Sequence, residues 1–437
     1  MKRMSLSRSS RSMHVDGARL ISRVERLRAV GASARNGVNR PAFSPADVRA
    51  RDLAADFMGQ AGLRPRVDAA ANLIGSVPGR RPGMGRLLVG SHLDTVPEGG
   101  AFDGAYGVLA AIEVFQSLRD HRVTLDHPAA AIVFSNEEGT PGTSPMFGSR
   151  AVAGMTDRGE LDRRDASGRT LRSLLADAGG DPGQLDTARW PAGSIAAFLE
   201  LHIEQGPVLE QAKTPIGVVE AISGRQTVAV TVAGTASHGG TTPMAHRRDA
   251  LVAAAQIVLG VRDLGGPSGV TRVATVGECV VRPGAWNVVP GEVRLVVDFR
   301  DIRSDAIERG VNRLRALADR VAADSGTDIT VMPAQRVAPV WCDSRLQALV
   351  AGAAEELGLA HQVLPSGAGH DTQWVSCVAP SAMIFVPSAG GISHTPDEYS
   401  APADLVAGAD VLLNAVLATD SQFEAHAVVQ DASHATG

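Results

Sequence analysis

Four apolar runs in this chain end in the same way, and this repeated ending limits the folds that the chain can adopt. Each run has the composition of a buried strand, and each leads into a histidine or a carboxylate beside Gly or Pro. The runs are Leu87–Gly90, Ile132–Phe134, Phe198–Ile203 and Ala382–Val386. Polar side chains at strand ends can converge on a cleft without entering the core. The pattern therefore predicts an α/β fold with a functional cleft at the strand ends.

The side chains at these run ends are of the kinds that bind divalent metals. Imidazole and carboxylate together are typical ligands of a borderline cation such as zinc. Neighbouring acids in one dry site would repel each other strongly unless a cation lay between them. The sequence therefore predicts a metal site. Its candidate ligands are His92, Asp103, Glu138, His202 and His394.

Eight motifs make the chain similar to a known family. In order from Ser91 to Glu398 they are SHLDTVPEGGAFDGAYG, SNEEG, ELHIEQGPVLE, GTASHGGTTPM, NVVPG, DFR, SGAGHD and SHTPDE. They resemble those of the M20-type binuclear zinc hydrolases. Within these, they resemble the branch of N-carbamoyl-L-amino acid hydrolases, allantoate amidohydrolases and β-ureidopropionases. The ELHIEQGPVLE segment separates this branch from the peptidase branch.

The resemblance implies a more detailed metal site than the spacing alone predicts. It implies that the five candidate ligands hold two divalent metal ions per subunit, with Asp103 as the bridging carboxylate. Zinc is the first expectation, and manganese, cobalt or nickel would also suit imidazole and carboxylate ligands.

Glu137 is the candidate general base. It directly precedes the candidate ligand Glu138, so one backbone turn could direct one carboxylate to metal and the other to the attacking water. The apolar residues Ile132–Phe134 before this pair argue against two ordinary surface acids.

The substrate contacts are expected mainly from the resemblance. Arg300 ends an apolar strand and could clamp a substrate carboxylate with its planar guanidinium group. The family pattern adds Asn287 beside it and makes His238 an oxyanion donor, often in the partner subunit's site. Allantoate amidohydrolases tend to have Arg where Gln226 stands, which weakens the case for a strongly anionic substrate. The expected substrate-binding residues are Gln205, Gln226, His238, Asn287, Arg300, Gly369 and His370.

The order of predicted elements indicates an interrupted α/β domain. We expect a catalytic domain with a mixed, largely parallel sheet flanked by helices, in two parts (15–222 and 338–420). Between them, residues 223–337 follow the order βαββαβ, which predicts an inserted ferredoxin-like lid or dimerisation domain. A flexible basic tail (1–14) and a flexible C-terminal tail (421–437) complete the predicted organisation.

Composition limits which partners and which cellular compartment the sequence favours. A chain of 437 residues with 44% hydrophobic and 20% charged residues is an ordinary globular protein of about two domains. Its net charge of −5 argues against nucleic acid as a partner, and its lack of a long uninterrupted apolar stretch argues against a membrane span. Three scattered cysteines are typical of reduced thiols in a cytoplasm. The resemblance and an exposed lid edge strand favour a homodimer formed through the lid.

These expectations favour one function and leave others open. The leading interpretation is hydrolysis of the ureido C–N bond of N-carbamoyl-L-amino acids to amino acid, CO2 and ammonia. Allantoate amidohydrolase, with the same metals and base but a different pocket, is one alternative. β-Ureidopropionase is another, since N-carbamoyl-β-alanine differs from N-carbamoylglycine by one methylene, which changes binding by only about 1–3 kcal/mol. A non-catalytic, metal-poor binding relative is a further alternative, although all five ligands and Glu137 are present.

Overall fold

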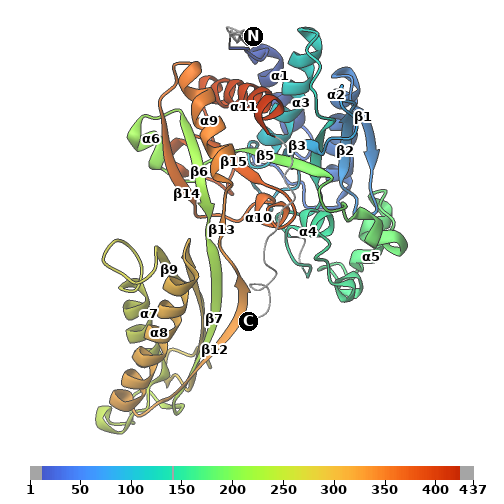
Figure 1. Cartoon of the computed structure of the whole chain (residues 1–437). Coiled ribbons are helices and arrows are strands. Elements are labelled where there is room, and N and C mark those ends of the chain that lie inside the picture. Colours follow the sequence, from blue (N-terminus) through green and yellow to red (C-terminus); the bar gives the residue numbers. More distant parts are fainter. Residues whose placement is uncertain (1–11, 140–141, 424–437) are drawn as a thin grey trace. The chain divides into compact units, whose positions relative to one another are not determined.

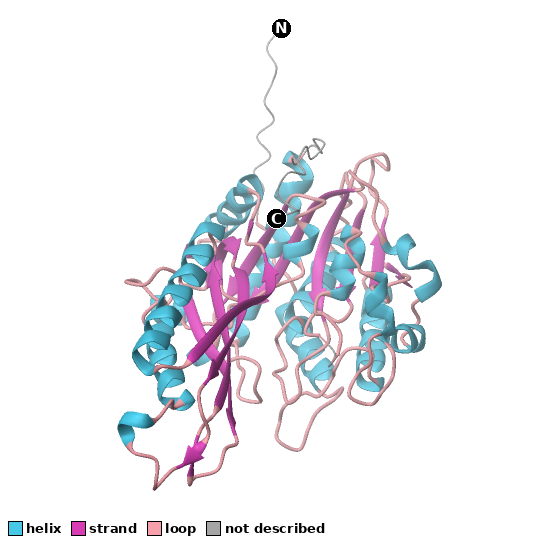
Figure 2. Cartoon of the chain, turned by 90° about the horizontal axis from the view of Figure 1, so that it is seen from below, coloured by secondary structure: helices cyan, strands magenta, loops and turns pink. Residues whose placement is uncertain are grey.

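The chain forms two compact units, one of them built from three separate segments (Figure 1). The structure, a computed structural model, describes residues 12–139 and 142–423. Of the described residues, the larger unit comprises those within 1–220, 342–364 and 370–437. The smaller unit comprises 221–341 and 365–369. Figure 2 shows that each unit combines helices with strands.

A nine-stranded mixed sheet organises the larger unit, and a few residues of its end strands belong to the smaller one. Its strand order is β1-β2-β4-β3-β5-β15-β6-β13, with β14 also paired to β6. The strands are β1 (Arg64–Val67), β2 (Leu73–Val77), β3 (Arg86–His92), β4 (Ala129–Phe134), β5 (Ile195–Ile203), β6 (Ile216–Ile222), β13 (Val340–Trp341), β14 (His361–Ser366) and β15 (Ser381–Val386).

The central strands β4, β3, β5 and β15 are parallel to one another in that order, and antiparallel strands flank them. Every residue of β4, β5 and β15 is buried, as expected for parallel strands covered on both faces. The apolar runs of the sequence are continuous because these strands are buried on both faces of the sheet. A largely parallel central sheet with helices is confirmed.

The helices of the larger unit are α1 (Gly17–Arg28), α2 (Pro45–Gln60), α3 (Ala105–Asp120), α4 (Phe147–Ala153), α5 (Leu171–Asp177), α6 (Val208–Ala212), α9 (Ser344–Glu356), α10 (Thr372–Val375) and α11 (Pro402–Gln422). Those that pack on the sheet are α2, α3, α4, α9, α10 and α11. Helix α3 packs on β3, β4 and β5 and is buried from Ala105 to Leu118. Because α3 begins directly after the Asp103 turn, the core fixes the end of that turn.

The smaller unit has a four-stranded antiparallel sheet with the order β12-β7-β11-β9. Its strands are β7 (Gly224–Ala233), β9 (Val273–Arg282), β11 (Glu292–Asp301) and β12 (Asp328–Val337). Its helices are α7 (Ala250–Arg262) and α8 (Ser304–Ser325). A separate two-stranded sheet pairs β8 (Ser237–His238) with β10 (Val288–Val289). Burial alternates along β7 and β11 because one face of the sheet packs on both helices.

The C-terminal helix α11 continues to Gln422, and Phe423 after it is buried, with the Arg345 guanidinium 4.4 Å from its ring centroid. The flexible tail predicted from residue 421 is therefore wrong for 421–423. Residues 12–14 of the predicted N-terminal tail are also held, since the Met13 N–H donates to Asn414 Oδ1. Residues 1–11 and 424–437 lie outside the described residues.

Among the described residues, α11 is long and apolar enough to cross a membrane, with 61% of that apolar stretch buried inside the structure. It packs on α3, α9, β5 and β15. We interpret α11 as a core helix of the larger unit.

Candidate metal centre

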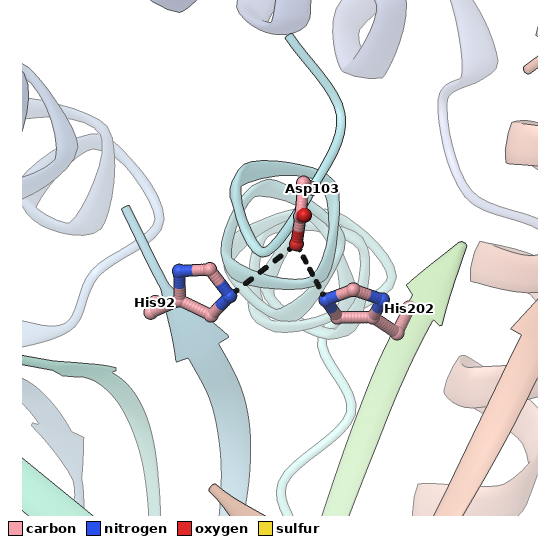
Figure 3. A group of neighbouring side chains, drawn as sticks. All are labelled: His92, Asp103 and His202. Atoms are coloured by element: carbon pink, nitrogen blue, oxygen red, sulfur yellow. Dashed lines mark ion pairs between the residues drawn. The ribbon is translucent and has the colours of Figure 1, made fainter. Parts of the chain in front are cut away.

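Three of the predicted ligands meet at the carboxyl ends of β3 and β5 (Figure 3). His92 is the last residue of β3, His202 lies on β5, and Asp103 is two residues before α3. The Asp103 carboxylate lies between the two rings, with Oδ1 3.5 Å from His92 Nε2 and 3.1 Å from His202 Nε2. All three side chains are buried. Parallel neighbouring strands thus bring together residues that are far apart in the sequence.

A second group shares Asp103 with the first. His394 Nε2 lies 3.1 Å from Asp103 Oδ2 and 3.5 Å from Glu138 Oε1. One atom from each of these three residues could contact a common ion, as could one atom from each member of the first group. The side chain of His394 is 50% exposed, whereas that of Asp103 is 6% exposed, so the second group faces solvent on one side. The five predicted ligands therefore form two candidate sites joined by one carboxylate.

The hydrogen bonds of the two buried histidines fit metal coordination. His92 Nδ1 lies 3.0 Å from the Asp94 carbonyl oxygen, and His202 Nδ1 lies 2.8 Å from the Ile203 carbonyl oxygen. A carbonyl can only accept, so each Nδ1 carries a hydrogen, and the Nε2 of each ring is the nitrogen that would bind a metal ion beside Asp103. His202 Nε2 also lies 3.1 Å from the Gly104 backbone nitrogen. This donor set of imidazole nitrogen and carboxylate oxygen suits zinc and its first-row neighbours.

Three residues at this cluster have backbone conformations that are rare for residues other than glycine. Asn136, Gln205 and His394 have φ values of 54°, 58° and 59°. Each is one of the predicted ligands or active-site residues, or directly precedes one. Such conformations persist only where the surrounding structure fixes them, and they are common at functional sites.

Two acidic residues that the sequence analysis did not single out hold the loops of the cluster. Asp94 accepts from the N–H groups of Glu137 and Glu138 at 3.1 and 3.0 Å. Glu398 accepts from the Asp103 N–H at 3.1 Å and from Ser393 Oγ at 2.7 Å. Both lie inside motifs already quoted, two residues after His92 and four after His394. Their position was visible in the sequence, but their partners are mainly backbone groups, which no residue pattern identifies.

Burial and mutual repulsion shift the pKa values of the acidic side chains in the cluster. Burial raises the pKa of Glu137 well above its ordinary value, and the charges of Glu138 and Asp371 add to this effect. Burial and Asp103 raise the pKa of Glu138 to about 7. Burial opposes the charge of Asp103, but hydrogen bonds from His202, His394 and His92 hold the pKa of that carboxyl well below its usual range. A cation at this position would relieve the repulsion among these carboxylates.

Two of the predicted substrate contacts also lie at the cluster. Gln205 Nε2 donates to Asp103 Oδ2 at 2.8 Å, so its amide is directed at the shared carboxylate. The His370 ring is buried with its centroid 4.6 Å from that of His202. Burial and the neighbouring His202 lower the pKa of His370 well below its ordinary value, which favours a neutral imidazole there. Glu137 lies beside the same group, with Oε2 3.7 Å from His92 Nε2.

The other predicted substrate contacts belong to the smaller unit. The exposed His238 accepts at Nδ1 from the N–H groups of Gly240 and Thr241 at 3.0 and 3.1 Å. Its Nε2 must then carry the hydrogen of the neutral ring, so it is a donor. Asn287 is adjacent, because its carbonyl accepts from the Gly239 N–H at 2.8 Å.

Arg300 and Gln226 are already engaged within the smaller unit. Arg300 Nη2 lies 3.0 Å from Asp298 Oδ2, and its Nη1 donates to the Gly367 carbonyl at 2.9 Å, two residues before Gly369. The Gln226 side chain is buried and its Nε2 donates to the Gln335 carbonyl at 3.2 Å. A substrate carboxylate at Arg300 would therefore compete with Asp298, and the amide of Gln226 would have to leave a structural partner to reach a substrate.

Residues 88–418 match the family model described as Peptidase family M20/M25/M40. The chain is 41% identical over 402 residues to an N-carbamoyl-L-amino acid amidohydrolase of Geobacillus stearothermophilus, covering 92% of this chain and 98% of the relative. It is 33% identical to an allantoate amidohydrolase of Bacillus subtilis strain 168, covering 89% of this chain and 94% of the relative. The crystal structure of an amidase of the hydantoinase/carbamoylase family from Burkholderia multivorans superposes with a TM-score of 0.87 at 36% identity, covering 94% of this chain and 99% of that chain.

Proposed function

Since this chain belongs to peptidase family M20/M25/M40 and is an amidohydrolase of C–N bonds, as its relatives are, we propose that it hydrolyses the ureido C–N bond of N-carbamoyl-L-amino acids. The products are the free amino acid, CO2 and ammonia. The observation that carries this proposal is the identity of 41% along nearly the whole length of a relative with that named activity. The assignment of the sequence motifs to the N-carbamoyl-L-amino acid hydrolase branch of this family is confirmed.

Allantoate is the second candidate substrate. Relatives named for allantoate and for ureidoglycolate match almost as much of the chain, at 33% and 32% identity. Gln226 stands where the resemblance expects an arginine in allantoate amidohydrolases, and in this structure it is buried against Gln335. This favours a substrate with one carboxylate. N-Carbamoyl-β-alanine remains a third candidate, because it differs from N-carbamoylglycine by one methylene.

We infer that two divalent metal ions bind at the cluster. Zinc is the metal we propose, and manganese, cobalt and nickel are alternatives. The residues that would hold them are His92, Asp103, Glu138, His202 and His394. When bound, such ions lower the pKa of a water molecule and polarise a carbonyl oxygen. The two groups share Asp103, which supports its assignment as the bridging carboxylate. The presence of the full set argues against a metal-poor binding relative.

Side chains of the protein would carry out proton transfer, stabilisation of the oxyanion and binding of the substrate. Glu137 would take the proton of the attacking water and return it to the leaving nitrogen, since its carboxylate lies beside the candidate metal ligands, 3.7 Å from His92 Nε2. His238 would donate its Nε2–H to the oxyanion that develops from the ureido carbonyl. Arg300 would bind the substrate carboxylate, with Asn287 assisting and with Gln205, Gln226, Gly369 and His370 lining the same substrate.

We further propose that the smaller unit is a ferredoxin-like lid through which two copies form a homodimer in the cytoplasm. Its strand order, with both helices on one face, supports the ferredoxin-like assignment. Helix α7 exposes the apolar side chains of Leu251, Val252 and Leu259 (40%, 54% and 55%), and β9 is an edge strand. A twin copy would cover both features. The three cysteines are free thiols, which supports a reducing compartment.

A substrate panel tests the function. The purified protein is assayed for ammonia release from several N-carbamoyl-L-amino acids, their D-enantiomers, allantoate and N-carbamoyl-β-alanine, each with added zinc, manganese, cobalt or nickel. We expect the highest kcat/KM for an N-carbamoyl-L-amino acid. A higher kcat/KM for allantoate or for N-carbamoyl-β-alanine would assign the corresponding alternative instead.

A further inference from the structure

The larger unit has a second hollow, at the edge of the sheet opposite to the metal-ligand cluster. A surface cavity of about 500 Å³ is lined by residues at the amino-terminal ends of three central strands: Arg86 begins β3, Pro128 precedes β4 and Ser194 precedes β5. His92 ends β3 six residues further along. At a rise of about 3.3 Å per residue, the two ends of this strand are about 20 Å apart. The cavity is therefore separate from the metal-ligand cluster.

The charged lining of this cavity is entirely cationic. Arg66, Arg86 and Arg189 line it, and no Asp or Glu is among its lining residues. Within residues 12–139 and 142–423, none of these three arginines forms an ion pair with a carboxylate. Some other arginines of the same unit do have a carboxylate partner: Arg150 binds Glu160 with two hydrogen bonds of 2.6 and 2.8 Å. Three guanidinium groups without an ion-pair partner around one hollow favour the binding of an anion there.

Two buried polar atoms at the cavity have no hydrogen-bond partner among the described residues. They are Arg86 Nε and Ser194 Oγ. Leaving such an atom unpaired destabilises the fold, so a native protein usually supplies a partner. The Arg86 guanidinium lies 5.5 Å from the Trp190 ring centroid, a cation–π contact that holds the group at the cavity. Burial and the nearby charge of Arg66 both lower the pKa of Arg86, which an anion would reverse.

The walls of the cavity are held by backbone contacts. The Arg86 N–H donates to the Ser194 carbonyl at 2.7 Å, and the Ser194 N–H donates to the Pro191 carbonyl at 3.0 Å. The carbonyl of Gly85 is in contact with His127 Nδ1 at 2.7 Å. The loop before β3 and the turn before β5 are thus fixed relative to each other, so the cavity is largely preformed.

We propose that this cavity binds a phosphate group, either free or attached to a small organic molecule, with Arg66, Arg86 and Arg189 as its cationic contacts and Trp190 as one wall. Guanidinium groups match phosphate oxygens with paired hydrogen bonds and remain charged at all relevant pH values. A phosphate group carries more charge and more acceptor oxygens than a single carboxylate, so it is the better match for three arginines. A volume of about 500 Å³ accommodates an organic phosphate up to the size of a nucleotide.

The test is isothermal titration of the full-length protein with inorganic phosphate and, separately, with ADP. The variants are Arg66→Gln and Arg189→Gln, both at exposed positions where folding should not depend on the side chain, and Arg86→Gln. We expect one phosphate or one ADP per chain, and a dissociation constant at least about tenfold higher in each variant, since a charge-assisted hydrogen bond contributes roughly 1.5–3 kcal/mol. Tighter binding of ADP would identify an organic phosphate, and equal binding would identify the free anion.

The matched control is Arg313→Gln, which removes an exposed arginine from α8 and should leave binding unchanged. Thermal melting of every variant shows whether it is folded. Phosphate held by the metal-ligand cluster instead would bind the wild type and all the variants alike. That result, or no binding of either probe by the wild type, would overturn the proposal.

Discussion

Asp94 and Glu398 show how single side chains of this centre act on the backbone. Asp94 fixes the N–H groups of Glu137 and Glu138, and Glu398 fixes the N–H of Asp103. The candidate metal ligands could be identified from the sequence, because imidazole and carboxylate side chains are rare at buried strand ends unless they bind something. These two supporting acids could not, because a carboxylate that accepts from backbone N–H groups leaves no paired residue pattern.

Glu137 is the residue whose replacement separates chemistry from metal binding. We expect Glu137→Gln to keep its metal and to lower kcat by about 10²–10⁴-fold, because the amide keeps the volume of the side chain but cannot accept a proton. Metal content and turnover are measured on one preparation. Glu138→Gln is the matched control, and it should lose metal along with activity. Loss of metal from Glu137→Gln as well would make Glu137 a ligand rather than a base.

The turn from β3 into α3 illustrates what the elements contribute. The apolar run Leu87–Gly90, which the sequence indicates as a buried strand, lies in β3 and is buried. The sequence does not indicate α4, which lies in a polar, Gly-rich region. Helix α4 is buried through tertiary contacts, including those with α10, rather than through a long apolar periodicity of its own.

Gly104 makes the close approach of that turn possible. Its φ is +61°, and a Cβ atom there would lie 2.4 Å from the His92 ring. We expect Gly104→Ala to displace His92, to weaken metal binding by at least about tenfold and to lower stability by more than about 1 kcal/mol. Metal titration and urea unfolding measure these effects.

Gly59 is the control glycine for that experiment. It lies inside α2 without a positive φ, and a Cβ atom at this position would have no other atom within 4 Å. Gly59→Ala should leave metal affinity unchanged and raise stability by about 0.5–1 kcal/mol. Equal behaviour of the two variants would mean that the Gly104 turn has no special role.

Considered as a whole, the chain divides its predicted site residues between two units. The metal-ligand cluster, Glu137, Gln205 and His370 belong to the larger unit, whereas His238, Asn287 and Arg300 belong to the smaller one. Membership of the family could be predicted because the motifs are long. The exact substrate could not, because the carboxylate-binding role of Arg300 depends on whether a ligand displaces Asp298 from it.

Subunit complementation tests whether His238 acts across a dimer, as the family resemblance implies. His238→Ala and Glu137→Gln are each expected to be inactive. When the two variants are mixed and allowed to exchange subunits, mixed dimers should contain one site with both residues intact, so that part of the activity returns. Size-exclusion chromatography with light scattering verifies the dimer, and a tagged subunit verifies exchange. Exchange without recovery of activity would place His238 in its own subunit's site or outside catalysis.

The most direct test of the account is a metal titration of the chelator-treated protein with ammonia release as the second readout. Zinc or manganese is added in steps to the apoprotein in the presence of an N-carbamoyl-L-amino acid. The five-ligand arrangement predicts two ions bound per chain and activity that rises until both are bound, with His92→Ala and His394→Ala each retaining at most one tightly bound ion. Full ammonia release after complete removal of metal, or no ion bound by the wild type, would contradict it.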